Sequence, residues 1–179
     1  APNMRGYGNS SIPPDKKDYA IENLLADVAA LIDAAECEET ILLAHDWGAV
    51  IAWYFSIREV RPLSKLVICN VPHPAAGIEG ASWAQLKKSW YIFFFQIPRL
   101  PEWLIGRRGN AMGEMIKASS TRPEMYSQEV IDLYSQNATR SGGLTAMINY
   151  YRELFFGGGA KRQKDQGFPI IETPTLMCW

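Results

Sequence analysis

The sequence predicts an α/β protein built on a parallel sheet, with a helical segment inserted between two strands and with the sheet incomplete at both ends. Residues 18 to 70 alternate between helix-like and strand-like patterns with short connections, which is typical of a parallel sheet covered by helices on both faces. Residues 75 to about 165 show no strand pattern, and an apolar run begins again only near Thr173. A long helical insertion therefore separates two strands.

The composition excludes several classes of function. The 179 residues are 47% hydrophobic and 21% charged, with a formal net charge of −1. This balance is typical of a soluble globular domain, and it gives no electrostatic reason to expect nucleic acid or an anionic membrane as a partner. No signal peptide or 18-residue apolar span is recognisable. The cysteines, Cys37, Cys69 and Cys178, lack metal-binding spacing, so no metal or cofactor is expected, and they weakly favour a reducing compartment.

The first elements lead up to the predicted sheet. The segment Ala1 to Pro14 is rich in Gly, Pro, Ser and Asn, which predicts a loop. Apolar residues then recur at helical spacing from Asp18 to Ala35, which predicts an amphipathic helix with Asp15 or Asp18 as its N-cap. After a short polar turn, the apolar run from Thr40 to Leu43 predicts a buried strand.

The next five residues, Ala44-His45-Asp46-Trp47-Gly48, predict a sharp turn from this strand into a buried helix over Ala49 to Phe55. Small residues two before and two after Asp46 allow the strand and the helix to approach closely. This is the spacing of a nucleophile elbow, in which a strained turn exposes one side chain at the top of a parallel sheet, beside a helix N-terminus. Ordinary helix N-capping is the alternative use of Asp46.

An aspartate at such a turn indicates attack on carbon. A carboxylate is ionised at neutral pH and needs no base to become a nucleophile. It forms an ester with alkyl carbon that water can later cleave, whereas attack on an ester or amide would give an anhydride too reactive to help. The residue type therefore predicts epoxides or alkyl halides as substrates.

Beyond the elbow helix, the sequence predicts one more strand, the helical insertion and a last strand. Leu63 to Asn70 is expected to be a buried strand, and Thr173 to Trp179 is expected to open the last one. Glycines 157 to 159, with the basic residues that follow them, predict a mobile solvated loop. The predicted helices of the insertion are Trp83–Gln96, Glu102–Ile105, Ala111–Ala118, Gln128–Gln136 and Leu144–Phe156.

Five stretches together resemble the epoxide hydrolase group of the α/β-hydrolases. They are R-G-Y-G-N-S (5–10), A-H-D-W-G-A (44–49), N-V-P-H-P (70–74), W-Y-I-F-F-F-Q-I-P-R-L-P-E (90–102) and N-Y-Y-R (149–152). The resemblance implies an α/β-hydrolase core over residues 1–74, a helical cap over 75–165 and a return to the core sheet over 166–179. Two residues depart from the family pattern: Ala44 stands where Gly is usual, and Asn3 where Asp is usual.

The resemblance also implies roles for four residues. Asp46 is the expected nucleophile, and the backbone N–H of Trp47 is expected to supply half of an oxyanion hole. The Trp47 ring is expected to form the floor of the substrate cavity. Tyr91 and Tyr151 are expected to donate to the opening epoxide oxygen, because a phenol stays neutral at pH 7 and can still give a proton. Core packing is the alternative for both tyrosines and for the Trp47 ring, and Tyr150 competes with Tyr151 for the donor role.

His45 and His73 are expected to be structural. His45 adjoins Asp46 on the turn, so their side chains diverge, and His73 begins the passage into the cap. In the family, the His and the acid that activate water follow the strand near Thr173, and the second oxyanion donor precedes Ala1. We therefore expect an internal fragment without turnover of its own, poorly soluble because its sheet edges are unpaired.

The expected function is the hydrolysis of a small apolar epoxide to a vicinal diol through an ester on Asp46. Water is the second substrate, and no nucleic acid or membrane-spanning segment is involved. A haloalkane dehalogenase is the alternative enzyme, although a departing halide needs Trp donors rather than phenols. A non-catalytic, ligand-binding α/β-hydrolase relative is the other alternative. The expected location is the cytoplasm, or the cytosolic face of a membrane through an anchor outside these residues.

Overall fold

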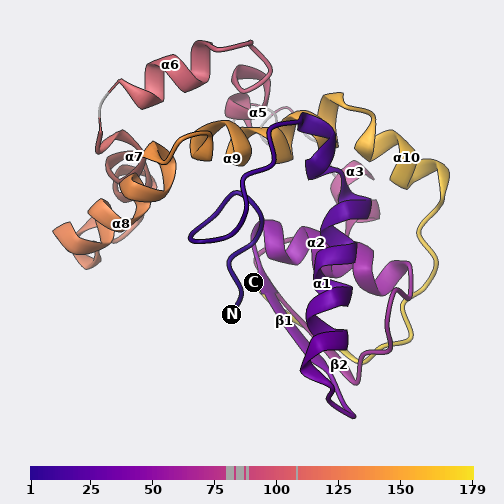
Figure 1. The fold of residues 1–179 in the computed structure, drawn as a ribbon. Coiled ribbons are helices and arrows are strands. Elements are labelled where there is room, and N and C mark those ends of the chain that lie inside the picture. Colours follow the sequence, from indigo (N-terminus) through magenta and orange to yellow (C-terminus); the bar gives the residue numbers. More distant parts are fainter. Residues whose placement is uncertain (80–82, 84–86, 88, 108) are drawn as a thin grey trace. The chain divides into compact units, whose positions relative to one another are not determined.

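The structure, a computed structural model, describes residues 1–79, 83, 87, 89–107 and 109–179 (Figure 1). It contains two compact units. The sheet unit comprises Ala20–Lys88 and Gly158–Trp179, and the helical unit comprises Ala1–Tyr19 and Ser89–Gly157. The helical unit thus includes the first 19 residues, and the limits of core and cap expected at 74/75 and 165/166 stay a prediction.

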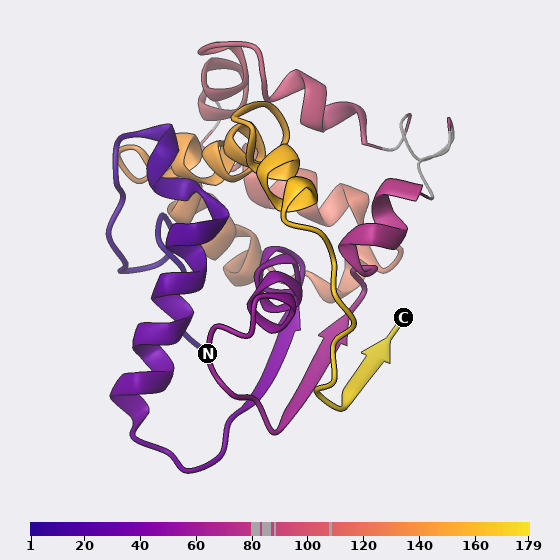
Figure 2. The same ribbon diagram turned by 90° about the vertical axis from the view of Figure 1, so that its right-hand side faces the viewer.

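The sheet unit contains three parallel strands in the order β1-β2-β3 (Figure 2). They are β1 (Ile41–His45), β2 (Lys65–Cys69) and β3 (Thr175–Cys178). Leu42 of β1 pairs with Leu66 of β2, which in turn pairs with Thr175 of β3. The predicted α/β class with a parallel sheet is confirmed.

The helices of the sheet unit whose bounds the structure describes are α1 (Ile21–Ala35), α2 (Trp47–Ile57), α3 (Pro74–Glu79) and α10 (Gly159–Asp165). Helix α2 packs on β1 and β2, and α1 packs on α2. The core between these elements is formed by apolar side chains that are almost completely buried: Ile21, Leu24, Ile51, Phe55, Leu66 and Ile68. Because every second residue of a strand faces the same side, Leu66 and Ile68 point together into this core.

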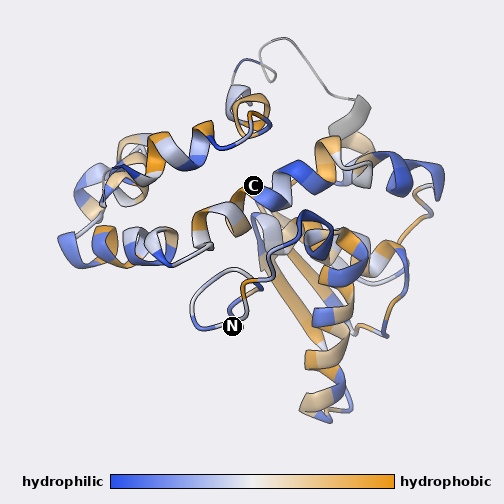
Figure 3. Cartoon of the chain, turned by 45° about the horizontal axis from the view of Figure 1, so that its top comes forward, coloured by the Kyte–Doolittle hydropathy of each residue, from blue (hydrophilic) through white to orange (hydrophobic). Residues whose placement is uncertain are grey.

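The prediction that β1 is buried is wrong for one of its two faces. Ala44 is buried, but Ile41 and Leu43 are 57% and 69% exposed. The two sets of residues alternate along the strand, so helix α2 covers one face and leaves the apolar side chains of the other face accessible. Figure 3 shows most of the length of the strands in orange, the colour of hydrophobic residues.

The predicted N-cap of the first helix is also wrong. Helix α1 begins at Ile21, after an N-cap Ala20 that makes no side-chain capping bond. Asp15 and Asp18 precede it, and Asp18 lies in a separate 3-10 turn, η1 (Lys16–Tyr19). Tyr19 ends this turn, is buried within the helical unit and donates from its hydroxyl to the Pro13 carbonyl at 2.8 Å. The anchoring of Tyr19 therefore interrupts the helical pattern.

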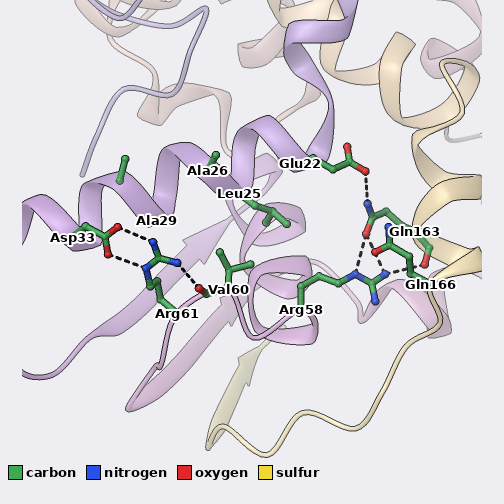
Figure 4. Close-up of a pocket in the computed structure, with 11 residues that line it drawn as sticks. Glu22, Leu25, Ala26, Ala29, Asp33, Arg58, Val60, Arg61, Gln163 and Gln166 are labelled. Carbon is green, nitrogen blue, oxygen red and sulfur yellow. Dashed lines mark hydrogen bonds and ion pairs between the residues drawn. The ribbon is translucent and has the colours of Figure 1, made fainter.

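The basic segment after glycines 157 to 159 is a helix, α10, and not the predicted mobile loop. Its residue Gln163 is 1% exposed, and it donates through Nε2 to the Glu22 carboxylate at 2.9 Å. Arg58 donates to the Gln163 backbone carbonyl at 2.9 Å and to its Oε1 at 3.1 Å (Figure 4). Long-range hydrogen bonds to α1 and to the end of α2 thus order a segment whose composition resembles that of a loop.

The helical unit has eight described elements. They are η1, α5 (Trp90–Phe94), α6 (Leu100–Gly106), α7 (Ala111–Ser119), the 3-10 turn η2 (Pro123–Met125), α8 (Gln128–Thr139), α9 (Gly143–Tyr151) and the π-helical turn η3 (Arg152–Phe156). The described part of residues 75–165 contains no strand, as predicted. The first part of the predicted helix over residues 83–96 falls largely outside the described residues.

Two interior clusters hold the helical unit together. Ile105, Leu144 and Ile148 form one, against Phe94 and Phe95. The other surrounds Tyr150, which is fully buried. Its ring contacts the rings of Tyr7 and Tyr19, and its hydroxyl donates to the Arg5 carbonyl at 2.8 Å. This second cluster attaches the N-terminal loop to α9.

Candidate active site

Asp46 lies at the reversal between β1 and α2. Its backbone has φ 51° and ψ −126°, a conformation that L-residues rarely adopt. The residue is exposed and stands at the N-cap position of α2, yet its side chain makes no capping hydrogen bond. The N-cap alternative therefore finds no support in the geometry. A strained turn with an uncommitted carboxylate is the arrangement expected of a nucleophile elbow.

Asn70 lies close to this turn, because its strand pairs with the strand that carries Asp46. The last residues of the two strands, His45 and Cys69, pair with each other, and Asp46 and Asn70 directly follow them. Asn70 also has a positive φ, 60°, and its N–H donates to the Cys178 carbonyl at 2.9 Å. Ligand sites of parallel sheets lie at this carboxyl edge, where the strands end.

The space between the small residues on either side of Asp46, Ala44 and Gly48, accommodates a methyl group. A Cβ atom added at Gly48 would lie 3.9 Å from the Ala44 Cβ, which is ordinary van der Waals distance. The methyl group of Ala44 therefore fits at this position. Trp47, the first residue of α2, has only 6% of its surface exposed, so its indole is largely part of the interior.

The two histidines have different surroundings. His45 is exposed. His73 packs edge to face against Trp53 and Phe168, with ring centroids 5.1 and 6.1 Å away. Burial lowers the pKa of His73 below its ordinary value, and its Nδ1 accepts the N–H of Ala75 at 3.3 Å. Both features favour a neutral imidazole held in place by its neighbours.

Tyr91 and Tyr151, from α5 and α9, meet within the helical unit. Their ring centroids are 5.7 Å apart and their planes are inclined at 85°. Phe95 contacts both, with its centroid 5.8 Å from Tyr91 and 5.1 Å from Tyr151. The two tyrosines thus share one aromatic cluster and remain partly accessible. Asp46 and Trp47 belong to the sheet unit, so the assembly of all four residues into one site remains a proposal.

Tyr150, the alternative to Tyr151, is committed elsewhere. It is fully buried, and its hydroxyl proton is donated to the Arg5 carbonyl. A donor role for Tyr150 would require breaking this bond and opening the cluster around it. The geometry therefore favours Tyr151 over Tyr150.

Arg152 connects the elements that carry the tyrosine pair, a role that the sequence did not predict. Its guanidinium donates to the carbonyls of Phe95 at 2.7 Å and Ile97 at 3.1 Å, beyond the end of α5. It also forms a two-pronged ion pair with Glu102, at 2.6 and 3.2 Å. Arg152 opens the π-helical turn that follows Tyr151, and such turns occur frequently at functional sites. In the sequence, the position of Arg152 in the N-Y-Y-R stretch was the signal that could have indicated this role.

The described residues give no indication of a metal centre or a membrane span. No three His, Cys, Asp or Glu side chains among them gather closely enough to hold a metal ion. In the same part of the chain, no helix is both long and apolar enough to cross a bilayer.

Comparison with known families classifies the chain. The family model described as alpha/beta hydrolase fold matches residues 1–179. This chain belongs to the alpha/beta hydrolase fold family. Among solved structures, this alpha/beta hydrolase is similar to an epoxide hydrolase from Vigna radiata, with a TM-score of 0.74 and 27% identity over 99% of this chain and 62% of that one.

Curated relatives of this alpha/beta hydrolase include several proteins named epoxide hydrolase. Epoxide hydrolase 2 of Caenorhabditis elegans is 34% identical over 98% of this chain and 50% of its own length. Epoxide hydrolase 4 of Mus musculus is 31% identical over 98% of this chain and 49% of its own length. AB hydrolase superfamily protein YfhM of Bacillus subtilis is 35% identical over the whole chain and 62% of its own length. The chain spans about half the length of the nematode and mouse relatives.

Proposed function

We propose that this alpha/beta hydrolase contributes to epoxide hydrolysis by forming a covalent ester on Asp46. The observation that carries the proposal is the backbone of Asp46, a non-glycine residue held at φ 51° and ψ −126° between β1 and α2. Such a conformation costs about 1–3 kcal/mol and persists at functional sites where the surrounding structure enforces it. Similarity to proteins named epoxide hydrolase supports the same reaction.

In the first step, a carboxylate oxygen of Asp46 attacks one epoxide carbon, and the bond from that carbon to the ring oxygen breaks. The ring oxygen leaves with the electron pair and takes a proton from Tyr91 or Tyr151, while the other phenol donates a hydrogen bond to it. The products are an alkyl ester on Asp46, a neighbouring hydroxyl group and a tyrosinate. The ester retains every atom of the epoxide, so no leaving group departs.

In the second step, water attacks the ester carbonyl carbon, and the resulting oxyanion is stabilised by backbone N–H groups such as that of Trp47. Its collapse breaks the bond to the alkyl oxygen, which takes one proton of the added water and leaves as the vicinal diol, and the Asp46 carboxylate is restored. The other proton of the water returns to the tyrosinate. Within the described residues we assign no base for the water. His45 is exposed on the turn, and His73 is held between Trp53 and Phe168.

The reaction of the chain with styrene oxide, followed by peptide mapping, tests the first step. We expect a mass increase of one intact epoxide on the peptide that contains Asp46. Cys37 and Cys178 are exposed thiols and react with epoxides as well, but hydroxylamine cleaves the ester and leaves the thioethers. The Asp46→Asn variant should lose only the hydroxylamine-sensitive adduct. Glu38→Gln, which removes an exposed carboxylate from the same unit, should keep it.

Labelling confined to cysteine side chains, or unchanged in Asp46→Asn, would contradict the covalent mechanism. A bromoalkane tests the alternative, haloalkane dehalogenase chemistry, because the same carboxylate can displace bromide. The tyrosine pair favours the epoxide as substrate, since an epoxide oxygen must be protonated when the ring opens, whereas a departing halide needs no proton. Bromide release that outpaces styrene oxide opening would favour the dehalogenase.

A further inference from the structure

The helical unit contains a concave site that the proposed reaction does not use. It is a pocket of about 520 Å³, within the range of about 300–1,000 Å³ typical of small-molecule sites. Polar and charged residues from η1, α6, α9 and the segments around them line it, and the apolar stems of their side chains form much of the lining surface: Lys16, Gln96, Arg99, Glu102, Asn149 and Arg152, with Pro98 and Thr145.

The floor of the pocket carries hydrogen-bonding groups without protein partners. Asn149 is only 4% exposed, yet no hydrogen bond joins its amide to another described residue. Thr145 lies one turn earlier on the same face of α9, and its hydroxyl also lacks a partner within the described part of the chain. The Asn149 amide is not among the fully buried polar atoms, so it faces accessible space, and both groups are available to hydrogen-bond a ligand in the pocket.

The rim of the pocket is positively charged. Arg152 and Glu102 neutralise each other through their ion pair. Lys16 and Arg99 also line the pocket, and neither forms an ion pair with any described carboxylate. The pocket therefore presents two uncompensated positive charges above the unpartnered Thr145 and Asn149.

Arg99 is held in a strained backbone conformation. Its φ of 63° and ψ of −21° lie in the left-handed region at the N-cap of α6, where glycine or asparagine is the usual residue. Its side chain forms no cap hydrogen bond that would account for a polar residue there. Strain at a long cationic residue that lines a pocket is typical of a binding position.

We propose that this pocket binds a phosphate group. A phosphate monoester carries close to two negative charges at pH 7, which matches Lys16 and Arg99 together. Its oxygens accept several hydrogen bonds at once, from the Arg99 guanidinium and from the floor groups of Thr145 and Asn149. The volume exceeds what one phosphate group fills, which leaves space for the organic part of a phosphorylated small molecule.

This site is separate from the tyrosine pair. Asn149 and Tyr151 are two residues apart on α9, so at about 100° per residue their side chains lie on nearly opposite sides of the helix. Neither Tyr91 nor Tyr151 lines the pocket. Phosphate binding therefore stands or falls independently of the epoxide reaction.

Calorimetric titration of the chain with phenyl phosphate, in a phosphate-free buffer, tests the proposal. We expect saturable binding whose affinity falls at least tenfold in Arg99→Gln and, separately, at least tenfold in Lys16→Gln. The two residues lie on different elements. Arg107→Gln is the matched control, because it removes the same charge from the end of α6. The Arg107 Cζ lies over the Trp103 ring, 4.4 Å from its centroid, and Arg107 does not line the pocket. Thermal melting of each variant establishes that it is folded.

Inorganic phosphate forms the second arm of the titration. Tighter binding of phenyl phosphate than of inorganic phosphate identifies a phosphorylated small molecule, and equal binding identifies the free ion; either result supports a phosphate site. No saturation with either probe overturns the proposal. So does an equal loss of binding in Arg99→Gln and Arg107→Gln, because that result indicates general charge screening.

Discussion

The rings of Tyr91 and Tyr151 meet edge to face, with centroids 5.7 Å apart and planes inclined at 85°. Aromatic pairs favour this geometry, and the Phe95 ring contacts both tyrosine rings. Each tyrosine comes from a different helix, so the contact fixes the two phenols relative to each other. Two phenols held this way can share the charge that develops on one oxygen.

Replacing either phenol by Phe should slow the opening of an epoxide. We expect Tyr91→Phe and Tyr151→Phe each to lower the rate of Asp46 labelling by styrene oxide roughly ten- to hundredfold, with a larger loss in the double variant, because one remaining donor compensates partly for the other. Tyr150→Phe is the control. It should leave the labelling rate unchanged and lower the free energy of unfolding by about 1 kcal/mol, because its bond to the Arg5 carbonyl is lost. Equal rates in all three variants would remove the tyrosine pair from the mechanism.

The strain at Asp46 predicts an exchange of stability for reactivity. Glycine adopts φ 51° and ψ −126° without a Cβ penalty, so Asp46→Gly should raise the free energy of unfolding by about 1 kcal/mol while abolishing ester formation. Urea unfolding and peptide mapping measure the two effects. Glu36→Gly is a matched control, since Glu36 has φ 48° after the end of α1 and should gain stability without losing the reaction. A destabilised Asp46→Gly would mean that the turn is not strained.

Close packing between α7 and α8 depends on Gly113. A Cβ atom at this position would overlap the backbone carbonyl oxygen of Ile131, which cannot move without distorting α8. We expect Gly113→Ala to lower the free energy of unfolding by about 1–3 kcal/mol, measured by urea titration. Gly106→Ala in α6 meets only the Leu144 side chain at ordinary contact distance, so it should be neutral or stabilising by up to about 1 kcal/mol. Similar values for the two variants would contradict this packing.

Sequence periodicity predicted the helices and strands that bury an apolar face, but not the points where they begin. The apolar spacing of α1 was sufficient to predict that helix. Its start was missed because Tyr19 packs into a cluster with Tyr150, 131 positions further along the chain. Helix α10 was predicted to be a loop because its order depends on hydrogen bonds of Gln163 to Glu22 and Arg58. Neither partner is close in sequence.

The same distinction applies to the site. Small residues on both sides of an aspartate predicted the turn at Asp46, since that constraint is local. The N-Y-Y-R stretch suggested a tyrosine, but only the contacts of Tyr150 with the N-terminal loop favour Tyr151. The sequence predicted no role for Arg152, because its partners Phe95 and Glu102 lie 57 and 50 residues away. Contacts between distant residues decide which members of a motif remain available for chemistry.

His73 should make stability depend on pH between about 5 and 7. Burial lowers the pKa of His73 in the folded chain. As the pH falls below the unfolded pKa of about 6.5, the unfolded state therefore becomes protonated before the folded state does. Stability is therefore complete above this pH and decreases as the pH falls towards the folded pKa. The ring is partly exposed and solvent weakens the effect, so we expect a small decrease in Tm between pH 7.5 and 5.5.

His73→Asn should remove this pH dependence, since asparagine does not titrate and its side chain can still accept the N–H of the second residue after it, here Ala75. Its Tm should fall at all pH values, because the ring contacts with Trp53 and Phe168 are lost. His45→Asn removes the exposed histidine and should keep the slope of the parent chain. The carboxyl group of Glu22 does not interfere, because its pKa is lowered and it titrates below this range. A slope that disappears in His45→Asn and persists in His73→Asn would assign the effect to the turn beside Asp46.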